Sequence, residues 1–164
     1  MIIMDKTLIV YYTYTGNTKI IASQIKQQLN CDMLELQPVV PFSSDYQTVV
    51  DEWQNNSIKA EVKIKDLNIN LKDYDNIVLC SPIWWYTITP VVMTFFKQND
   101  LSNKTIYPVL TSAGWFGHAV EDIKKLAPQS KIGQSLLVNT GMDYSAHIVQ
   151  SYKPNFNEWL NSIK

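Results

Sequence analysis

The sequence contains no arginine: all 14 of its basic residues are lysines, which stand against 15 acidic residues, for a formal net charge of −1. The planar guanidinium group of arginine is the usual means of gripping a phosphate at two points or of reading a guanine base. Its absence argues against nucleic-acid binding. It also argues against an arginine clamp for the extra phosphate of NADP.

Cysteines and long apolar runs are scarce as well. Cys31 and Cys80 are the two cysteines, and their wide separation excludes a C-x-x-C redox motif or a zinc ribbon, so we expect them to be buried and expect no metal site. No apolar run approaches the roughly 20 residues that a membrane helix needs. Residues 1–5 lack the features of a signal peptide. We therefore expect a cytoplasmic protein that does not contact a membrane.

Short apolar runs alternate with amphipathic segments along the 164 residues. Five strands alternating with helices predict an α/β fold, in which helices cover both faces of a parallel sheet. No linker or internal repeat divides the chain, so we expect a single domain over residues 1–164. The predicted strands are residues 7–12, 33–36, 76–81, 105–111 and 135–138, and the predicted helices are residues 18–29, 46–53, 90–97, 120–127 and 154–163.

The loop after the first predicted strand has the composition of a phosphate site. Ligands of open parallel sheets bind beyond the carboxyl ends of the strands, and backbone N–H groups at a helix N-terminus bind phosphate without a cation. Gly16 lets the backbone approach closely, and the threonines add hydroxyl donors. The alternative is an ordinary strand–helix turn with capping threonines. The candidate residues are Thr13, Tyr14, Thr15, Gly16, Asn17 and Thr18.

The loops after the third and fourth predicted strands are rich in aromatic residues. Trp84, Trp85 and Tyr86 are adjacent on one loop, and Trp115 and Phe116 are adjacent on the other. Exposed aromatic side chains are costly unless they cover something or await a partner. A flat ring held between the two loops would bury a large apolar area. We expect one of Trp84 and Trp85 to point into the core instead.

Together the three loops resemble those of the flavodoxin family, in the branch whose flavin loop carries a P-x-W-W pattern. Residues 13–18, 81–86 and 111–117 are similar, in order and spacing, to the phosphate loop and the two flavin loops of that branch. The resemblance implies a flavodoxin-like, doubly wound, five-stranded parallel sheet of strand order 2-1-3-4-5, and an FMN whose ring lies between the second and third loops. The residues implied to contact the flavin there are Ser81, Pro82, Ile83, Trp84, Trp85, Tyr86, Thr111, Ser112, Ala113, Gly114, Trp115, Phe116 and Gly117.

The function expected from this resemblance is that of an FMN-binding electron-transfer protein. We expect a monomeric one-electron carrier that serves redox partner proteins, a reductase and an acceptor, with no catalytic side chain of its own. An apolar pocket beside a phosphate dianion disfavours the anionic reduced flavin, which predicts a low potential for that reduction step. The main alternative is an FMN-dependent NAD(P)H oxidoreductase of the quinone reductase type. A third is a cofactor-free binding module that uses the aromatic loops as an interface.

The charged residues after the second aromatic loop favour a structural interpretation. We expect His118 to be a surface residue at a helix start, although its position near the predicted flavin leaves a redox role open. Glu121, Asp122 and the lysines at 124 and 125 are expected to form a solvated helix face.

Overall fold

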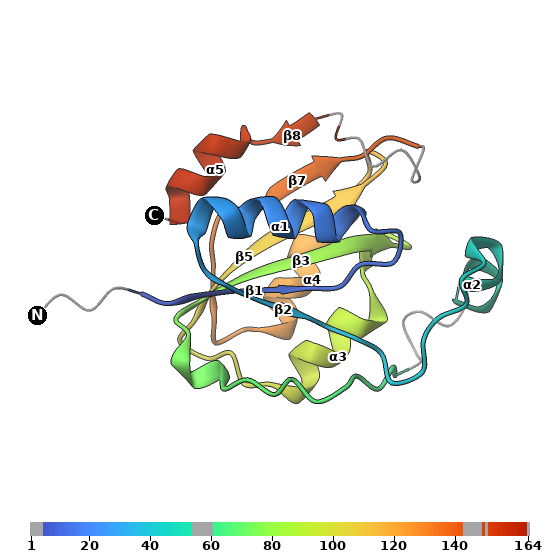
Figure 1. Cartoon of the computed structure of the whole chain (residues 1–164), viewed down its shortest axis with the longest axis horizontal. Coiled ribbons are helices and arrows are strands. Elements are labelled where there is room, and N and C mark those ends of the chain that lie inside the picture. The colour runs from blue at the N-terminus through green and yellow to red at the C-terminus, as the bar shows by residue number, and fades with distance from the viewer. Residues whose placement is uncertain (1–4, 54–60, 143–148, 150, 164) are drawn as a thin grey trace, which may run out of the picture.

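The computed structural model describes residues 5–53, 61–142, 149 and 151–163. Its centre is an eight-stranded sheet whose main path runs β2-β1-β3-β5-β7-β8, with β4 paired to β3 and β6 paired to β5 (Figure 1). The strands are β1 (Thr7–Tyr11), β2 (Asp32–Glu35), β3 (Asn76–Trp84), β4 (Thr87–Ile88), β5 (Thr105–Ser112), β6 (Lys131–Ile132), β7 (Leu136–Asn139) and β8 (Ser151–Lys153). The helices are α1 (Asn17–Leu29), α2 (Tyr46–Trp53), the short 3-10 helix Leu71–Asp73, α3 (Pro90–Gln98), α4 (Ala119–Leu126) and α5 (Phe156–Ile163).

The central strands are buried on both faces. In β1, Leu8 and Val10 belong to one hydrophobic cluster and Ile9 to the other, because successive side chains of a strand point to opposite faces. All three side chains are fully shielded from solvent. Apolar runs of this kind are typical of parallel strands that are covered on both sides.

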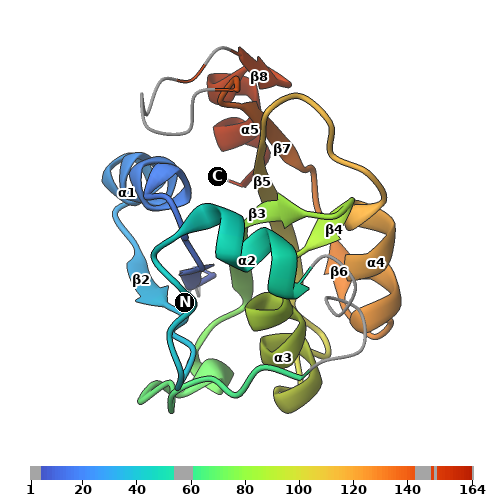
Figure 2. The same ribbon diagram turned by 90° about the vertical axis from the view of Figure 1, so that its right-hand side faces the viewer.

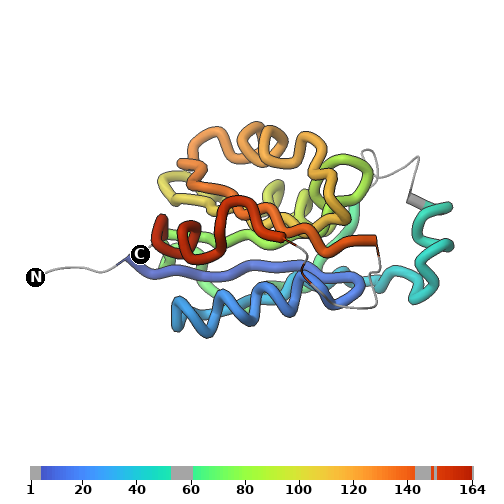
Figure 3. The backbone as a smooth tube through the Cα atoms, turned by 90° about the horizontal axis from the view of Figure 1, so that it is seen from above, coloured from blue at the N-terminus to red at the C-terminus, as the bar shows by residue number. Residues whose placement is uncertain are grey.

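Helices cover the two faces in pairs (Figures 1 and 3). Helices α1 and α5 pack over one face, where Ile21 and Ile25 of α1 share a cluster with Trp159 of α5. Helices α3 and α4 pack over the other face, where Phe95 and Ile123 are fully buried. This arrangement leaves the ends of the strands as the parts of the sheet that no helix layer covers.

Helix α2 differs from the other helices, because it lies beyond the carboxyl ends of the strands rather than on a face. Figure 2 looks onto that edge and shows α2 in front of the end of β3. Asp45 caps the helix, since its Oδ2 accepts hydrogen bonds from the backbone N–H and the hydroxyl of Thr48. Val49 is buried, whereas Tyr46 remains half exposed.

The prediction of a five-stranded parallel sheet is wrong in strand number, and it does not include the antiparallel strand at one edge. The five predicted strands do lie side by side as β2, β1, β3, β5 and β7, but β8 then adds an antiparallel edge strand. Strand β8 has three residues and β4 and β6 have two each. Segments this short carry no periodic apolar pattern, so their pairing is decided by tertiary contacts.

Large apolar side chains that stay exposed gather at the carboxyl edge of the sheet. Among the described residues, each of them follows the carboxyl end of a strand or lies in the first turn of a helix that follows such a strand end. They are Ile20, Val39, Val40, Tyr46, Tyr86, Trp115 and Met142. Across the described ranges, no helix has the length and apolar character needed to cross a membrane.

Candidate functional site

The three predicted loops meet at the carboxyl edge of the sheet. The hydroxyl oxygens of Thr18 and Thr111 lie 2.9 Å apart and join the first loop to the third. The rings of Tyr14 and Trp84, with centroids 5.7 Å apart, join the first loop to the second. The sequence therefore identifies three segments that the fold brings together.

The first loop ends at the N-terminus of α1. Gly16 stands before the helix with φ 101°, a left-handed conformation that favours glycine, and no side chain caps the helix there. The hydroxyl of Thr13 accepts a hydrogen bond from the N–H of Gly16 at 3.1 Å, which shapes the turn. An uncapped helix start carries partial positive charge and outward N–H groups, both of which favour an anion.

Tyr14 links the first loop to the segment before α2. Its hydroxyl donates a hydrogen bond to the carbonyl of Ser43, and its ring lies against that of Tyr46, with centroids 6.5 Å apart. Burial, with a contribution from the charge of Asp45, raises the pKa of Tyr14. Tyr14 thus stays neutral and acts as a structural bridge.

A hollow of about 80 Å³ opens between these loops, and we call it the donor hollow. Its lining combines hydroxyl and amide groups with the apolar side chains of Ile83 and Trp84. This volume suits a phosphate with part of a sugar chain, since pockets that bury a drug-sized ligand measure roughly 300–1,000 Å³. The lining residues are Tyr14, Thr15, Asn17, Thr18, Tyr46, Pro82, Ile83, Trp84, Thr111, Ser112, Ala113 and Thr140.

Two of these lining residues, Tyr46 and Thr140, were not identified from the sequence. Thr140 directly follows β7, so the rule that directed attention to the other strand ends would have found it. Tyr46 reaches the hollow only because α2 lies across the edge, which no local pattern indicates. Ser81, in contrast, is fully buried inside the sheet, where its hydroxyl donates to the carbonyl of Pro82.

The second loop is a β-hairpin, so the predicted end of the strand at residue 81 is wrong. Strand β3 continues through Trp84 and turns back into β4, pairing Ile83 with Ile88 and Trp84 with Thr87. Ile83 and Trp84 are good strand formers, and Pro82 is accommodated on the main sheet beside Thr111.

The turn of this hairpin is strained. Trp85 and Tyr86 connect the strands with φ of 46° and 73°. A two-residue turn with positive φ at both positions favours Asn-Gly, and each left-handed non-glycine residue costs roughly 1–2 kcal/mol. Strain of this kind clusters at functional sites, where it fixes a side-chain direction.

Trp84 is the tryptophan that points inward, which confirms that one of the pair packs against the core. It makes edge-on ring contacts with Tyr12, Tyr14 and Phe42, with centroids between 5.2 and 6.1 Å. Burial raises the pKa of Tyr12 in this cluster. Trp85 stays half-buried beside Trp84, with ring centroids 6.0 Å apart.

The start of the third loop lines the donor hollow, and its later residues pack against the hairpin. Trp115 is 68% exposed, and its ring lies 4.5 Å from that of Tyr86 between centroids. Phe116 is half-buried against the core. A Cβ added to Gly117 would meet the carbonyl oxygen of Tyr86 at 2.1 Å, so only glycine allows this approach; Gly114, with φ 127°, borders Asn139 instead.

A carboxylate network fastens these two segments, and the prediction that Asp122 belongs to a solvated face is wrong. Its Oδ2 lies 2.5 Å from both Thr87 Oγ1 of β4 and His118 Nδ1. The backbone N–H of His118 donates to the carbonyl of Tyr86 at 2.8 Å. His118 does stand at the start of α4, as predicted. The hairpin and the third loop therefore form one unit.

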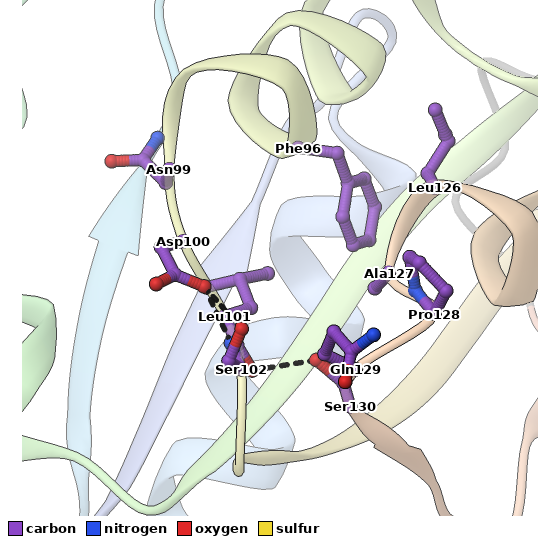
Figure 4. A pocket seen from close by; sticks show the side chains of 10 residues that line it. All are labelled: Phe96, Asn99, Asp100, Leu101, Ser102, Leu126, Ala127, Pro128, Gln129 and Ser130. Carbon is purple, nitrogen blue, oxygen red and sulfur yellow. Dashed lines mark hydrogen bonds between the residues drawn. The ribbon is translucent and has the colours of Figure 1, made fainter.

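Another hollow, of about 190 Å³, lies at the opposite edge between the ends of α3 and α4 (Figure 4). Three of its polar side chains make hydrogen bonds within the lining: Ser102 donates through its N–H and hydroxyl to Asp100, and Ser130 donates to the carbonyl of Leu101. The bonds from Ser102 lower the pKa of Asp100. These contacts stabilise a turn, and none of the predicted site residues lies there.

The profile of the flavodoxin family matches residues 6–153. A protein of Bacteroides eggerthii assigned as a flavoprotein is 26% identical, and the comparison covers 98% of each chain with a TM-score of 0.78. A flavoprotein of Lactobacillus acidophilus in complex with FMN is 24% identical, with a TM-score of 0.66, over 80% of this chain and 92% of that one. A comparison with curated proteins finds no match.

Proposed function

Because this chain belongs to the flavodoxin family, we propose that it binds one FMN at the donor hollow and carries single electrons between partner proteins. The observation that supports this most directly is the donor set: hydroxyl and amide groups gather at the uncapped start of α1. They fit an anionic phosphate without any guanidinium group. Bound FMN supplies the redox chemistry, and the protein supplies binding and electrostatics.

The phosphate is held by the first loop in this proposal. The helix start offers its N–H groups, and Thr15 and Thr18 offer hydroxyl protons from the wall of the hollow. Thr18 is almost fully buried, so a hydrogen bond from it to an anion is not weakened by water.

The ring lies, in this proposal, against Ile83 and Trp84, the apolar side chains shared by the wall of the hollow and the second loop. The hollow is too small for the whole flavin, so the ring is placed at its open mouth, close to solvent. An exposed ring edge suits transfer of electrons to a docked protein. The apolar rim formed by residues such as Tyr86 and Trp115 would border that contact.

An FMN titration of the cofactor-free protein tests the cofactor. We expect saturable quenching of flavin fluorescence with one FMN per chain, and weaker binding of riboflavin, which has no phosphate. Equal affinity for both ligands would contradict the phosphate site. A redox titration should then give a low potential for the formation of the fully reduced flavin; a value well above that of free FMN would contradict the electrostatic argument.

The exposed indole of Trp115 favours a second candidate, an FMN-dependent NAD(P)H oxidoreductase. Its 68% exposed ring offers a face on which a nicotinamide could stack. Mixing the FMN-loaded protein with NADPH in the absence of other proteins separates the two. Rapid bleaching of the flavin identifies a reductase, whereas a stable yellow colour supports the carrier.

A further inference from the structure

A second hollow, separate from the donor hollow, lies between α2 and the hairpin. Its volume is about 210 Å³, and we call it the apolar hollow. It shares three wall residues with the donor hollow, but no residue of the first or third loop lines it. The lining residues are Tyr46, Val49, Val50, Ile83, Trp84 and Trp85.

The chemistry of this lining differs from that of the donor hollow. It contains two tryptophans and three aliphatic side chains, and no charged group. The tyrosine hydroxyl and the indole N–H groups are its polar side-chain atoms. A charged ligand would lose hydration here without gaining an oppositely charged group, so the lining favours a neutral molecule.

The size of the apolar hollow limits what it takes. A cavity of about 150 Å³ lined by aliphatic side chains holds a benzene molecule, and drug-sized ligands need roughly 300 Å³ or more. A volume of about 210 Å³ therefore suits a molecule of one or two fused rings. Trp84 and Trp85 stand at 80° to each other, so a flat ring could stack on one and meet the edge of the other.

The strained turn is an independent sign that this hollow is built. Trp85 has φ 46°, a conformation that an indole side chain rarely adopts. That conformation places Trp85 in the wall of the apolar hollow. Core packing does not account for it, because Trp84, and not Trp85, packs against the main cluster.

From these observations we propose that the apolar hollow binds a neutral, flat aromatic molecule of one or two rings. Its place beside FMN, across the shared wall of Ile83 and Trp84, rests on the proposed function. Binding of the aromatic molecule itself does not depend on the proposed function. A ligand there would lie next to the redox group without displacing it.

Calorimetric titration with naphthol, a neutral two-ring probe, tests the proposal. We expect naphthol to bind the protein with and without FMN, with affinities within about twofold of each other, and naphthoate, its anionic counterpart, to bind at least about tenfold more weakly. Val50→Trp, which fills the hollow, should weaken naphthol binding about tenfold and leave FMN affinity unchanged. Val50→Leu should weaken naphthol binding to a smaller extent. Val40→Trp, at an exposed valine outside the hollow, should not change naphthol binding.

Three results would overturn the proposal: no naphthol binding, mutual exclusion of naphthol and FMN, or equal binding of naphthol and naphthoate. Mutual exclusion would mean that the apolar hollow belongs to the cofactor site. If FMN itself fails to bind, the proposed function fails, but the naphthol titration of the cofactor-free protein still decides the present proposal.

Discussion

The hydroxyl oxygens of Thr18 and Thr111 lie 2.9 Å apart across the site, although 93 residues separate them in the chain. A threonine has one hydroxyl proton and two acceptor lone pairs. If Thr111 donates to Thr18, the proton of Thr18 is available to a bound anion. In that arrangement the hydroxyl of Thr111 in the third loop satisfies Thr18 as an acceptor, and Thr18 in the first loop donates to the anion.

We expect Thr18→Val to lower FMN affinity about tenfold or more, because a hydrogen bond to a charged group contributes roughly 1.5–3 kcal/mol. Riboflavin affinity should change little, since riboflavin carries no phosphate. Thr111→Val should produce a smaller loss of FMN affinity, and Thr105→Val, at the other end of β5, should produce none. Fluorescence titration of the three variants with both ligands measures these affinities, and equal losses for FMN and riboflavin in Thr18→Val would rule out a phosphate contact.

Gly117→Ala should destabilise the protein by more than about 2 kcal/mol. The added Cβ would overlap the carbonyl oxygen of Tyr86 at 2.1 Å, at a residue that already has φ 55°. Gly114→Ala shares the positive φ, but its Cβ would stay 3.4 Å from Asn139. Urea unfolding of both variants gives the free energy lost by each, and the difference is the cost of the overlap between the added Cβ and the carbonyl oxygen of Tyr86. Equal losses would show that backbone conformation alone matters.

Two buried threonines near α3 should respond in opposite ways to replacement by valine. Thr89 Oγ1 has no hydrogen-bond partner, whereas Thr94 Oγ1 donates to the carbonyl of Val62 at 2.6 Å. Thr94→Val leaves a buried carbonyl with one partner fewer and should cost about 1–3 kcal/mol. Thr89→Val removes an unpaired hydroxyl and should be neutral or stabilising. Thermal unfolding tests the pair, and a large loss at Thr89 would reveal a partner for its hydroxyl.

The free energy of unfolding should fall between pH 10.0 and about 12. The hydrogen bond from Tyr74 to Asp32 raises the pKa of Tyr74 from 10.0 to about 12. In that window the folded chain retains a proton that the unfolded chain has lost, so stability is full below pH 10.0 and is lost as pH rises.

In Tyr74→Phe the loss of unfolding free energy that Tyr74 causes should be absent. A smaller loss at alkaline pH should persist in the variant, because burial also raises the pKa of Tyr11 and Tyr12. Denaturant unfolding at several alkaline pH values compares the two chains. Identical slopes would show that Tyr74 titrates normally.

Local sequence patterns predict the main strands and helices because each carries an apolar repeat long enough to read. The run around Leu8 and the stripe through Ile21 and Ile25 are examples. The hairpin was not predicted, since a positive φ at Trp85 contradicts the residue preference of such turns. The role of Asp122 depends on contacts between separate segments, and no spacing in the sequence indicates them.

The same limit explains the incomplete prediction of the site. The rule that ligands lie at strand ends found the first loop through Gly16, because its composition is distinctive. Tyr46 joins the donor hollow only through the position of α2, which tertiary packing decides. Composition therefore directed attention to the sheet edge where the donor hollow lies, and tertiary packing decides which side chains line that hollow.

The one-sided distribution of exposed apolar side chains has a consequence for electrochemistry. Because Tyr86, Trp115 and Met142 all follow strand ends at a single edge, a hydrophobic electrode should adsorb the molecule with that edge facing it. Such a film would hold every redox centre at a short and uniform distance from the conductor. Direct voltammetry without a mediator should then work on graphite and fail on a hydroxyl-coated gold surface.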